Sequence, residues 1–136
     1  MDQITVSTAA DQVNAVTHFV NGHLEKLGCS ERVMIQVDVA VDEIFSNIAH
    51  YAYSQGTGPV TVGVETEKNP PAVAVTFIDC GIPYDPLARE MPDTTRLPKE
   101  ERPIGGLGLY LVKKTMDHVS YTCQDGHNIL TIRKKI

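Results

Sequence analysis

The segment VDEIFSNIAHYAY, residues 41–53, combines a helical hydrophobic pattern with two polar residues that a purely structural helix would not need. Val41, Ile44 and Ile48 recur at spacings of three and four, which is typical of the buried face of an amphipathic helix. At roughly 100° per residue, Asn47 lies about 60° from Ile44 and Glu43 lies about 100° to the same side. Both side chains are costly to bury unless a partner satisfies them. The pair therefore indicates either a solvated helix edge or a functional site.

The composition is typical of a globular protein. The 136 residues are 42% apolar and 21% charged, which fits a single domain over residues 1–136. The net charge of −5 argues against direct nucleic-acid binding. No apolar run approaches the roughly 18 residues of a membrane span, and no signal-peptide pattern is present, so we expect a cytoplasmic protein without membrane contact. Cys29, Cys80 and Cys123 lack metal-site spacing, and we expect them to be reduced thiols in the core.

The hydrophobic periodicity predicts an α+β fold. Helices are predicted over 13–27, with Thr8 as the cap and Gly28 as the stop, and from Ser30 to about residue 54. After Gly58 the period changes to two, which predicts strands over 59–67 and 72–79. A third helix over 107–117 and a hairpin over 119–135 with an Asp-Gly turn complete the pattern, after an opening strand near residues 4–7. The order predicts a two-layer α/β sandwich, in which helices cover one face of a mixed, mostly antiparallel sheet.

Two further segments carry residues that suit a nucleotide. In FIDCGIPYD, residues 77–85, Asp79 ends a buried strand, and its carboxylate can accept from a donor such as the exocyclic amine of adenine. Taken alone, an Asx-type turn is the better explanation of this residue. In RPIGGLGLYLVKK, residues 102–114, glycines stand where a loop enters a helix, and unpaired N–H groups there favour phosphate. Neither the dinucleotide fingerprint nor the Walker spacing is present.

Taken in order, Glu43-xxx-Asn47, Asp79-x-Gly81 and Gly106-Leu107-Gly108-Leu109 resemble the N, G1 and G2 boxes of the GHKL ATPase superfamily. Within it, nearly the whole chain resembles the anti-sigma factor serine/threonine kinases. The resemblance implies the Bergerat fold, and ATP and Mg²⁺ as cofactors. It also implies a role in transcription regulation, in which the protein binds a sigma factor in one state and phosphorylates a STAS-domain antagonist in the other. Members of this branch commonly dimerise, which implies a homodimer.

The resemblance also implies a role for each motif residue. Glu43 would be the general base, and Asn47 would hold Mg²⁺ through its side-chain oxygen. Asp79 would accept from the adenine amino group, with Gly81 allowing close approach of the base. The remaining ATP-binding candidates are Gly105, Gly106, Leu107 and Gly108, whose N–H groups would cradle the phosphates, and Tyr51 near the metal.

The chain departs from this pattern at three places. The branch usually has histidine four residues after the N-box asparagine, where this chain has Tyr51, with His50 one position earlier. Ile104 stands where histidine kinases have a leading glycine. The branch often has a threonine on the last strands, near the adenine. In this chain Thr131 is one candidate for that position, and Asn128 competes with it. The loop between 86 and 105 would be the ATP lid, in which Arg96, Lys99 and Arg102 are either solvated charges, which we favour, or γ-phosphate contacts.

Two other functions remain open at the level of sequence. A non-catalytic ATP-binding regulatory module would sequester a protein partner without phosphorylating it, and Tyr51 in the histidine position gives this alternative weight. The catalytic fragment of a histidine kinase is less favoured, because no preceding helix carries a phosphoacceptor pattern.

Overall fold

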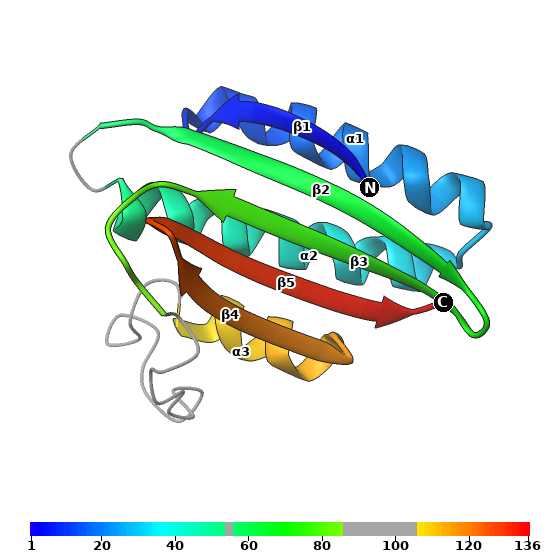
Figure 1. Ribbon diagram of the computed structural model, residues 1–136. Coiled ribbons are helices and arrows are strands. Elements are labelled where there is room, and N and C mark those ends of the chain that lie inside the picture. The colour runs from blue at the N-terminus through cyan, green and yellow to red at the C-terminus, as the bar shows by residue number, and fades with distance from the viewer. Residues whose placement is uncertain (54–55, 86–105) are drawn as a thin grey trace, which may run out of the picture.

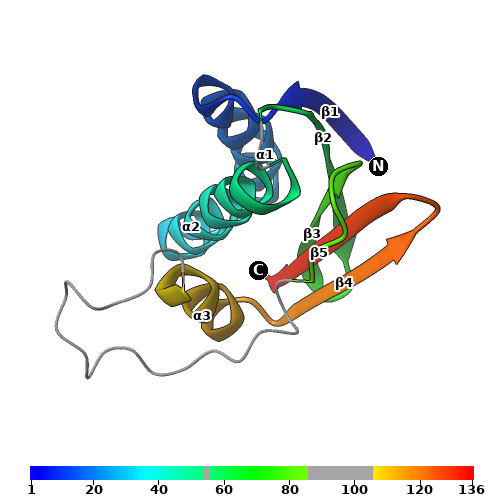
Figure 2. The ribbon, with the colours of Figure 1, turned by 90° about the vertical axis from the view of Figure 1, so that its left-hand side faces the viewer.

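The computed structural model describes residues 1–53, 56–85 and 106–136, in which helices cover one face of a five-stranded sheet (Figures 1 and 2). The sheet order is β1-β2-β3-β5-β4, and every described pairing is antiparallel. The predicted two-layer α+β sandwich with a mostly antiparallel sheet is therefore confirmed. The strands are β1 (Asp2–Ser7), β2 (Pro59–Lys68), β3 (Pro71–Asp79), β4 (His118–Gln124) and β5 (His127–Lys135). The helices and helical turns are η1 (Ala10–Gln12), α1 (Val13–Leu27), α2 (Glu31–Asn47), η2 (Ile48–Ala52) and α3 (Gly106–Thr115).

Helix α1 packs through an apolar stripe and ends at a glycine. Val16, Val20 and Leu24 are fully buried, as their spacing predicts. Gly28 adopts the left-handed conformation at φ 66°, and its N–H donates to Glu25 O and Leu24 O. Only a residue without Cβ adopts this conformation at little cost, which makes Gly28 the stop that the sequence predicts.

Helix α2 lies between α1 and α3 (Figure 2) and carries both Glu43 and Asn47. The Ser30 side chain accepts from the Val33 N–H at 3.3 Å and caps its first turn. The helix was predicted to continue regularly past Ala52, but it widens after Asn47 into one turn of π-helix, η2. Tyr53 N–H donates to Ile48 O, five residues back. Single π-turns of this kind are frequent at functional sites.

The sheet presents an apolar face to the helices. Val60, Val62 and Val64 of β2 are at most 2% exposed, whereas the residues between them point to the other face. On β3, Phe77 is fully buried in the same core. A turn at Asp125 and Gly126, both with positive φ, closes the predicted β4–β5 hairpin. Burial of each such side chain favours folding by about 1.5–3 kcal/mol.

The start of α1 differs from the prediction. Thr8 was expected to cap the helix, but no side chain caps η1 or α1. Instead, the Thr8 hydroxyl accepts from Gly58 N–H at 3.1 Å, and Thr8 N–H donates to Gly58 O at 2.9 Å. Thr8 is 4% exposed, and these bonds join the ends of β1 and β2. The tertiary partner thus replaces the local one that sequence spacing suggested.

The three cysteines are free thiols, as predicted, but two of them lie outside the core. Cys29 is half-buried after α1, whereas Cys80 and Cys123 are exposed. Cys80 follows the end of β3, and Cys123 lies near the end of the edge strand β4. Because both are exposed, the prediction of three core thiols is wrong for this pair.

No helix within residues 1–53, 56–85 and 106–136 is both long enough and apolar enough to span a bilayer.

Candidate functional site

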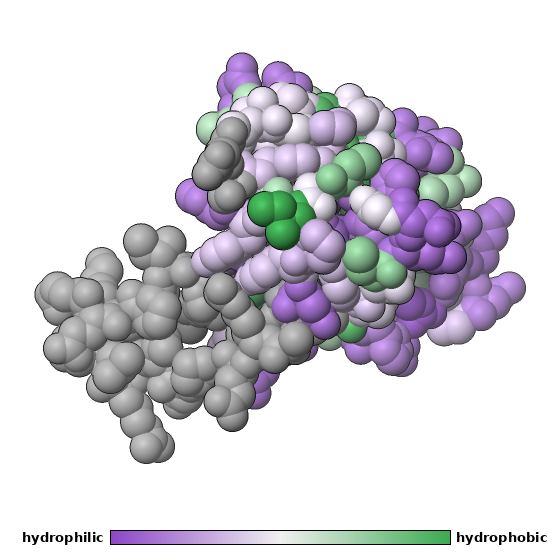
Figure 3. Space-filling model, turned by 60° about the vertical axis from the view of Figure 1, so that its left-hand side comes forward, coloured by the Kyte–Doolittle hydropathy of each residue, from purple (hydrophilic) through white to green (hydrophobic). Residues whose placement is uncertain are grey.

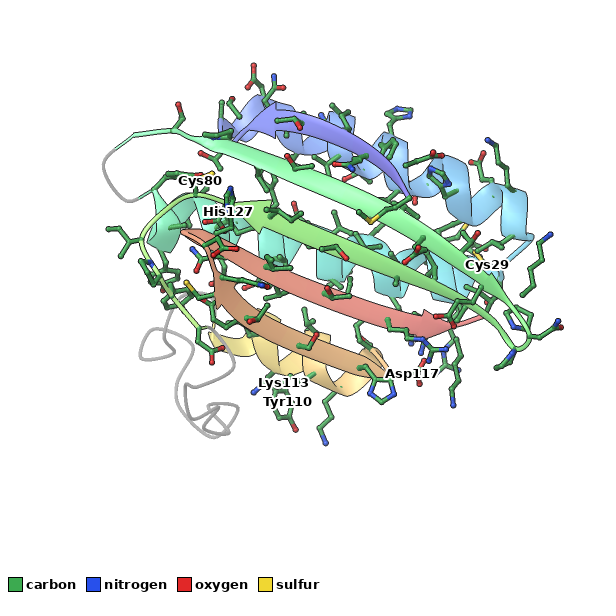
Figure 4. All side chains as sticks on the ribbon, in the orientation of Figure 1. Cys29, Cys80, Tyr110, Lys113, Asp117 and His127 are labelled. Carbon is green, nitrogen blue, oxygen red and sulfur yellow. The ribbon has the colours of Figure 1, made fainter. Side chains whose placement is uncertain are left out.

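One end of the molecule collects the end of β3, the beginning of β5 and the end of α2. Asp79 of β3 lies opposite Asn128 of β5 in the antiparallel register. Their neighbours Cys80 and His127 accordingly appear at the same end of the sheet (Figure 4). The polar residues of the first two motifs converge here.

Glu43 and Asn47 contact each other along one flank of α2. The Asn47 amide Nδ2 donates to the Glu43 carbonyl O at 2.8 Å and to its carboxylate Oε1 at 3.1 Å. Asn47 is 7% exposed, whereas Glu43 is half-buried at the rim. Because the amide nitrogen is turned towards Glu43, the Asn47 oxygen Oδ1 points away from it. No described residue donates a hydrogen bond to that oxygen.

Partial burial raises the pKa of the Glu43 carboxyl above its usual value. The hydrogen bond from Asn47 acts in the opposite direction, and the nearby Asp42 carboxylate adds a smaller upward shift in the pKa. A carboxylate with a raised pKa is a better proton acceptor than a fully solvated one. Glu43 therefore has the environment that a general base requires.

Asp79 is a buried carboxylate with one oxygen engaged. It is 4% exposed, and its Oδ1 accepts from Gly81 N–H at 2.9 Å and from Asn128 Nδ2 at 2.8 Å. The first of these bonds is the Asx-type turn considered from the sequence. No described residue donates to the second oxygen, Oδ2. A carboxylate oxygen that no described residue engages fits a ligand that brings a donor.

Gly81 is required by close packing against the end of α2. A Cβ atom on Gly81 would lie 2.4 Å from the Ala52 carbonyl oxygen, a separation that real Cβ atoms do not adopt. The next residue, Ile82, donates its N–H to the same Ala52 oxygen at 3.0 Å. These contacts fix the turn after Asp79 to η2. Gly81 thus has a packing role besides the approach of a base that the sequence suggested.

Tyr53 ties three segments together at the same place. Its hydroxyl donates to Pro59 O at 2.8 Å and accepts from Cys80 N–H at 2.8 Å. The side chain thereby links the end of η2 to the beginning of β2 and the end of β3. Burial raises the pKa of the Tyr53 hydroxyl, so it stays protonated at neutral pH and remains a donor.

A pocket opens between these elements. It is lined by Ile44, Asn47, Ile48, Ala52, Asp79, Tyr84, Leu109, Tyr121, Asn128 and Leu130. Asn47 and Asp79, from the first and second motifs, therefore face one cavity, and Leu109 brings the third motif to its wall. The cavity volume is about 20 Å³, which holds about one water molecule. A larger ligand enters only if lining side chains move.

The glycine-rich motif supplies the beginning of α3. The helix starts at Gly106, so Gly106, Leu107 and Gly108 form its first turn, in which backbone N–H groups have no helical partner. No acidic residue stands in this turn, and Lys113 and Lys114 stand in the last turn. This charge distribution leaves the helix dipole available to an anion at its start. Gly105, Ile104 and the expected lid over 86–105, with Arg96, Lys99 and Arg102, lie outside the described residues.

Tyr51 does not line the pocket but stacks on a residue that does. Its ring lies 4.7 Å from the ring of Tyr84, with 14° between the planes. His50 lies beside it, 6.4 Å away between ring centroids. Tyr51, which departs from the family pattern, therefore reaches the pocket through its contact with Tyr84. The sequence did not indicate Tyr84 as a site residue.

Asn128, and not Thr131, is the β5 residue beside Asp79. Thr131 points to the opposite face of the sheet, where its hydroxyl lies 3.2 Å from that of Thr76. Asn128 is 5% exposed and lines the pocket. The alternation along β5 separates these two candidates, and only the register against β3 decides which of them reaches the carboxylate.

The described residues contain no group of three or more His, Cys, Asp or Glu side chains that could hold a metal by itself. The Asn47 oxygen is a hard ligand of the type that Mg²⁺ accepts, and Mg²⁺ often binds through one or two side chains together with phosphates and water. The donor set therefore fits a magnesium ion that arrives with a nucleotide.

The described surface around this end is mainly hydrophilic, and its few strongly hydrophobic residues stand apart (Figure 3). Ile82, beside the site, is 61% exposed. On the face in Figure 3, the described residues therefore form no broad apolar patch.

A family model described as the histidine kinase-like ATPase domain matches residues 6–134. The serine/threonine-protein kinase BtrW of Bordetella bronchiseptica is 28% identical over 129 residues, which cover 95% of this chain and 87% of that protein. A serine-protein kinase RsbW of Bacillus cereus is 24% identical over 133 residues, which cover 94% of this chain and 81% of that protein. The resemblance inferred from the three motifs is thereby confirmed.

Solved structures of similar fold agree with these matches. The RsbU and RsbW domains of a Mycobacterium tuberculosis protein superpose with a TM-score of 0.64 at 13% identity, over 99% of this chain and 32% of that longer chain. The SiaB–SiaC complex of Pseudomonas aeruginosa gives a TM-score of 0.62 at 19% identity, over 100% of this chain and 90% of that chain. At these identities the likeness establishes the fold alone.

Gly81→Ala is expected to lower the free energy of unfolding by about 1–3 kcal/mol, because the new Cβ must displace the Ala52 backbone. Gly22→Ala is the matched control, since a Cβ there meets nothing within 4 Å and the residue lies inside α1. The control should raise the free energy of unfolding by about 0.5–1 kcal/mol. Urea unfolding of both variants measures the difference, and equal effects would contradict the close packing at Gly81.

The difference in melting temperature between Glu43→Gln and the parent protein is expected to change in favour of the variant as pH increases from 4 to 8. The folded-state pKa of Glu43 is raised, so its contribution to stability is complete below the unfolded pKa of about 4.3 and is lost as pH rises through the folded pKa. Glutamine does not ionise and avoids this loss.

Glu67→Gln serves as the control of opposite sign. The hydrogen bond from Arg133 lowers the pKa of Glu67, so its contribution is present above the unfolded pKa and is lost as pH falls through the folded pKa. Thermal melts of the three proteins across this range test the pair. A difference between Glu43→Gln and parent that does not change with pH would refute the buried-carboxylate assignment.

Proposed function

Because the chain belongs to the histidine kinase-like ATPase domain family, we propose that it is an ATP-dependent serine/threonine protein kinase that acts as an anti-sigma regulatory factor. One observation carries the proposal. Asn47 and Asp79, from separate motifs, line one pocket, and Asn47 is hydrogen-bonded to Glu43 at its rim. The relatives named serine-protein kinases share this chain over more than nine-tenths of its length.

The base and the phosphates of the nucleotide would bind to different residues of the site. Asp79 Oδ2 accepts from the exocyclic amine of adenine, which is a donor that guanine lacks at the same ring position. The first turn of α3 receives the phosphates on its N–H groups. Tyr84 lines the pocket and would have to move to admit the base, which would also change its stacking on Tyr51.

The phosphoryl-transfer step would depend on positioning and on one poised carboxylate. Glu43 accepts the proton of the acceptor hydroxyl, and burial favours this by raising its pKa. Asn47 donates to Glu43 Oε1, which orients the carboxylate, and offers Oδ1 to Mg²⁺. When bound, Mg²⁺ supplies charge neutralisation on the phosphates. No covalent enzyme intermediate is required.

The protein partners would follow the kinase branch that the chain resembles. The acceptor would be a serine or threonine on a STAS-domain antagonist, and a sigma factor would be the alternative partner. We propose a cytoplasmic homodimer with no direct nucleic-acid or membrane contact. The net charge of −5 supports the absence of direct nucleic-acid contact.

A second candidate function is an ATP-binding module that sequesters a partner without phosphorylating it. Tyr51, which stacks on Tyr84 at the pocket where the branch usually has histidine, favours this candidate. ADP formation measured with and without STAS-domain proteins separates the two functions, since a binding module forms no ADP.

Glu43→Gln is expected to keep an affinity for Mg-ATP within about threefold of that of the parent protein. Its rate of phosphoryl transfer is expected to fall by about 10²- to 10⁴-fold. Glutamine keeps the oxygen that Asn47 contacts but does not accept the proton. Transfer of radiolabelled phosphate from ATP to a STAS-domain protein measures the effect. Glu31→Gln, in the first turn of the same helix, is the control and should retain full turnover. Equal turnover in both variants would remove Glu43 from the mechanism.

A further inference from the structure

We propose that Asn128 is a positioning residue that makes the pocket select a base with an exocyclic amine, and that it does so by fixing the direction of the Asp79 carboxylate. The inference rests on the proposed nucleotide-binding function and adds a determinant of base selectivity to it. The proposal comes from the hydrogen bonds that join buried Asp79 and Asn128 to half-buried Tyr121, and we call these three residues the base-reading triad.

Every polar atom of the Asn128 side chain is engaged within the protein. Its Nδ2 donates to Asp79 Oδ1 at 2.8 Å and to Ile82 O at 3.1 Å, with Gly81 O farther away at 3.5 Å. Its Oδ1 accepts from the Tyr121 hydroxyl. Asn128 is 5% exposed. Both Nδ2 hydrogens are used within the protein and Oδ1 already accepts from Tyr121, so Asn128 acts through its neighbours.

Tyr121 favours the observed direction of the Asn128 amide, together with the acceptors that Nδ2 contacts. The hydroxyl of Tyr121 donates to Oδ1, and burial raises the pKa of this hydroxyl, which keeps it protonated. The amide oxygen is therefore held towards β4, and the amide nitrogen is held towards β3. In the reverse orientation the Asn128 oxygen would face the Asp79 carboxylate, and two acceptors would oppose each other.

The triad fixes the roles of the two Asp79 oxygens. Oδ1 receives the Asn128 and Gly81 donors, and Oδ2 has no donor among the described residues. Asp79 lines the pocket, so its unengaged acceptor is the one available to a ligand. An amine at purine position 6 satisfies it, whereas a carbonyl oxygen at that position places acceptor against acceptor. Sites built around such a bond reject analogues that lack the donor by factors as large as about 10⁴.

The same geometry makes a prediction for a change at Asp79 itself. In Asp79→Asn, the Asn128 and Gly81 donors would hold the new side-chain oxygen in the place of Oδ1. The new amide nitrogen would then occupy the place of Oδ2 and would donate to a 6-oxo base. The preferred nucleotide should therefore change from ATP to inosine triphosphate.

The test measures the dissociation constants of Mg-ATP and of Mg-inosine triphosphate by calorimetry for each full-length protein. Wild type should prefer ATP by at least about 100-fold, and Asp79→Asn should invert the preference. Asn128→Leu, of similar volume, should weaken ATP binding at least tenfold and change inosine triphosphate binding by less than threefold. Tyr121→Phe should also lower the preference for ATP over inosine triphosphate. It is the milder variant and serves as the test if Asn128→Leu does not fold.

Thr131→Val on the outward face of the same strand is the matched control and should leave the ratio unchanged. A purely structural role for Asn128 would weaken both nucleotides equally, and that result would overturn the proposal. Equal affinity of wild type for the two nucleotides would overturn it as well. If wild type bound neither nucleotide at millimolar concentration, the proposed function itself would fail first, so the two failures are distinct.

Discussion

The close approach of Gly81 to Ala52 sets the distance between the end of the helix layer and the end of the sheet. A Cβ at Gly81 would lie 2.4 Å from the Ala52 oxygen, and Ile82 N–H is bonded to that same oxygen. This contact holds the turn after Asp79 against η2 and so brings Asp79 into the pocket that Asn47 lines. The site depends on it because Asn47 and Asp79 lie 32 positions apart in the chain, and no local interaction brings them together.

Asn47 and Asp79 are tolerated in the interior because each makes hydrogen bonds within the protein. Asn47 gives its amide nitrogen to Glu43, and Asp79 gives one oxygen to Gly81 and Asn128. Asn47 Oδ1 and Asp79 Oδ2 accept a hydrogen bond from no described residue, so both acceptors are available to a ligand that brings a donor or a cation. Burial also raises the pKa of the Glu43 carboxyl. Burial at this end of the molecule thus affects both the stability of the fold and the proton affinity of the Glu43 carboxylate.

Local patterns predicted the parts of this protein that local physics determines. The stop at Gly28, the cap at Ser30, the alternation of Val60, Val62 and Val64 and the Asp-Gly hairpin follow from backbone conformation and periodicity. Thr8 and η2 were missed because tertiary hydrogen bonds and a widened turn override the local rule. Tyr53, Tyr84 and Tyr121 gave no signal, since a tyrosine reads as an ordinary core residue until the elements around it are placed. Asn128 and Thr131 could be separated only by strand register.

In the proposed function, three separated segments enclose one magnesium-bound adenine nucleotide. A titration of isotope-labelled protein with Mg-ATP, followed through the backbone amide signals, tests it most directly, because it reports both affinity and location. We expect saturable shifts concentrated at Asn47, at 79–82, at 106–109 and at Asn128. Absence of binding at millimolar Mg-ATP would contradict the proposed function. So would saturable shifts confined to another hollow, such as the one lined by Lys113, Asp117 and His118 on the side of α3 next to β4.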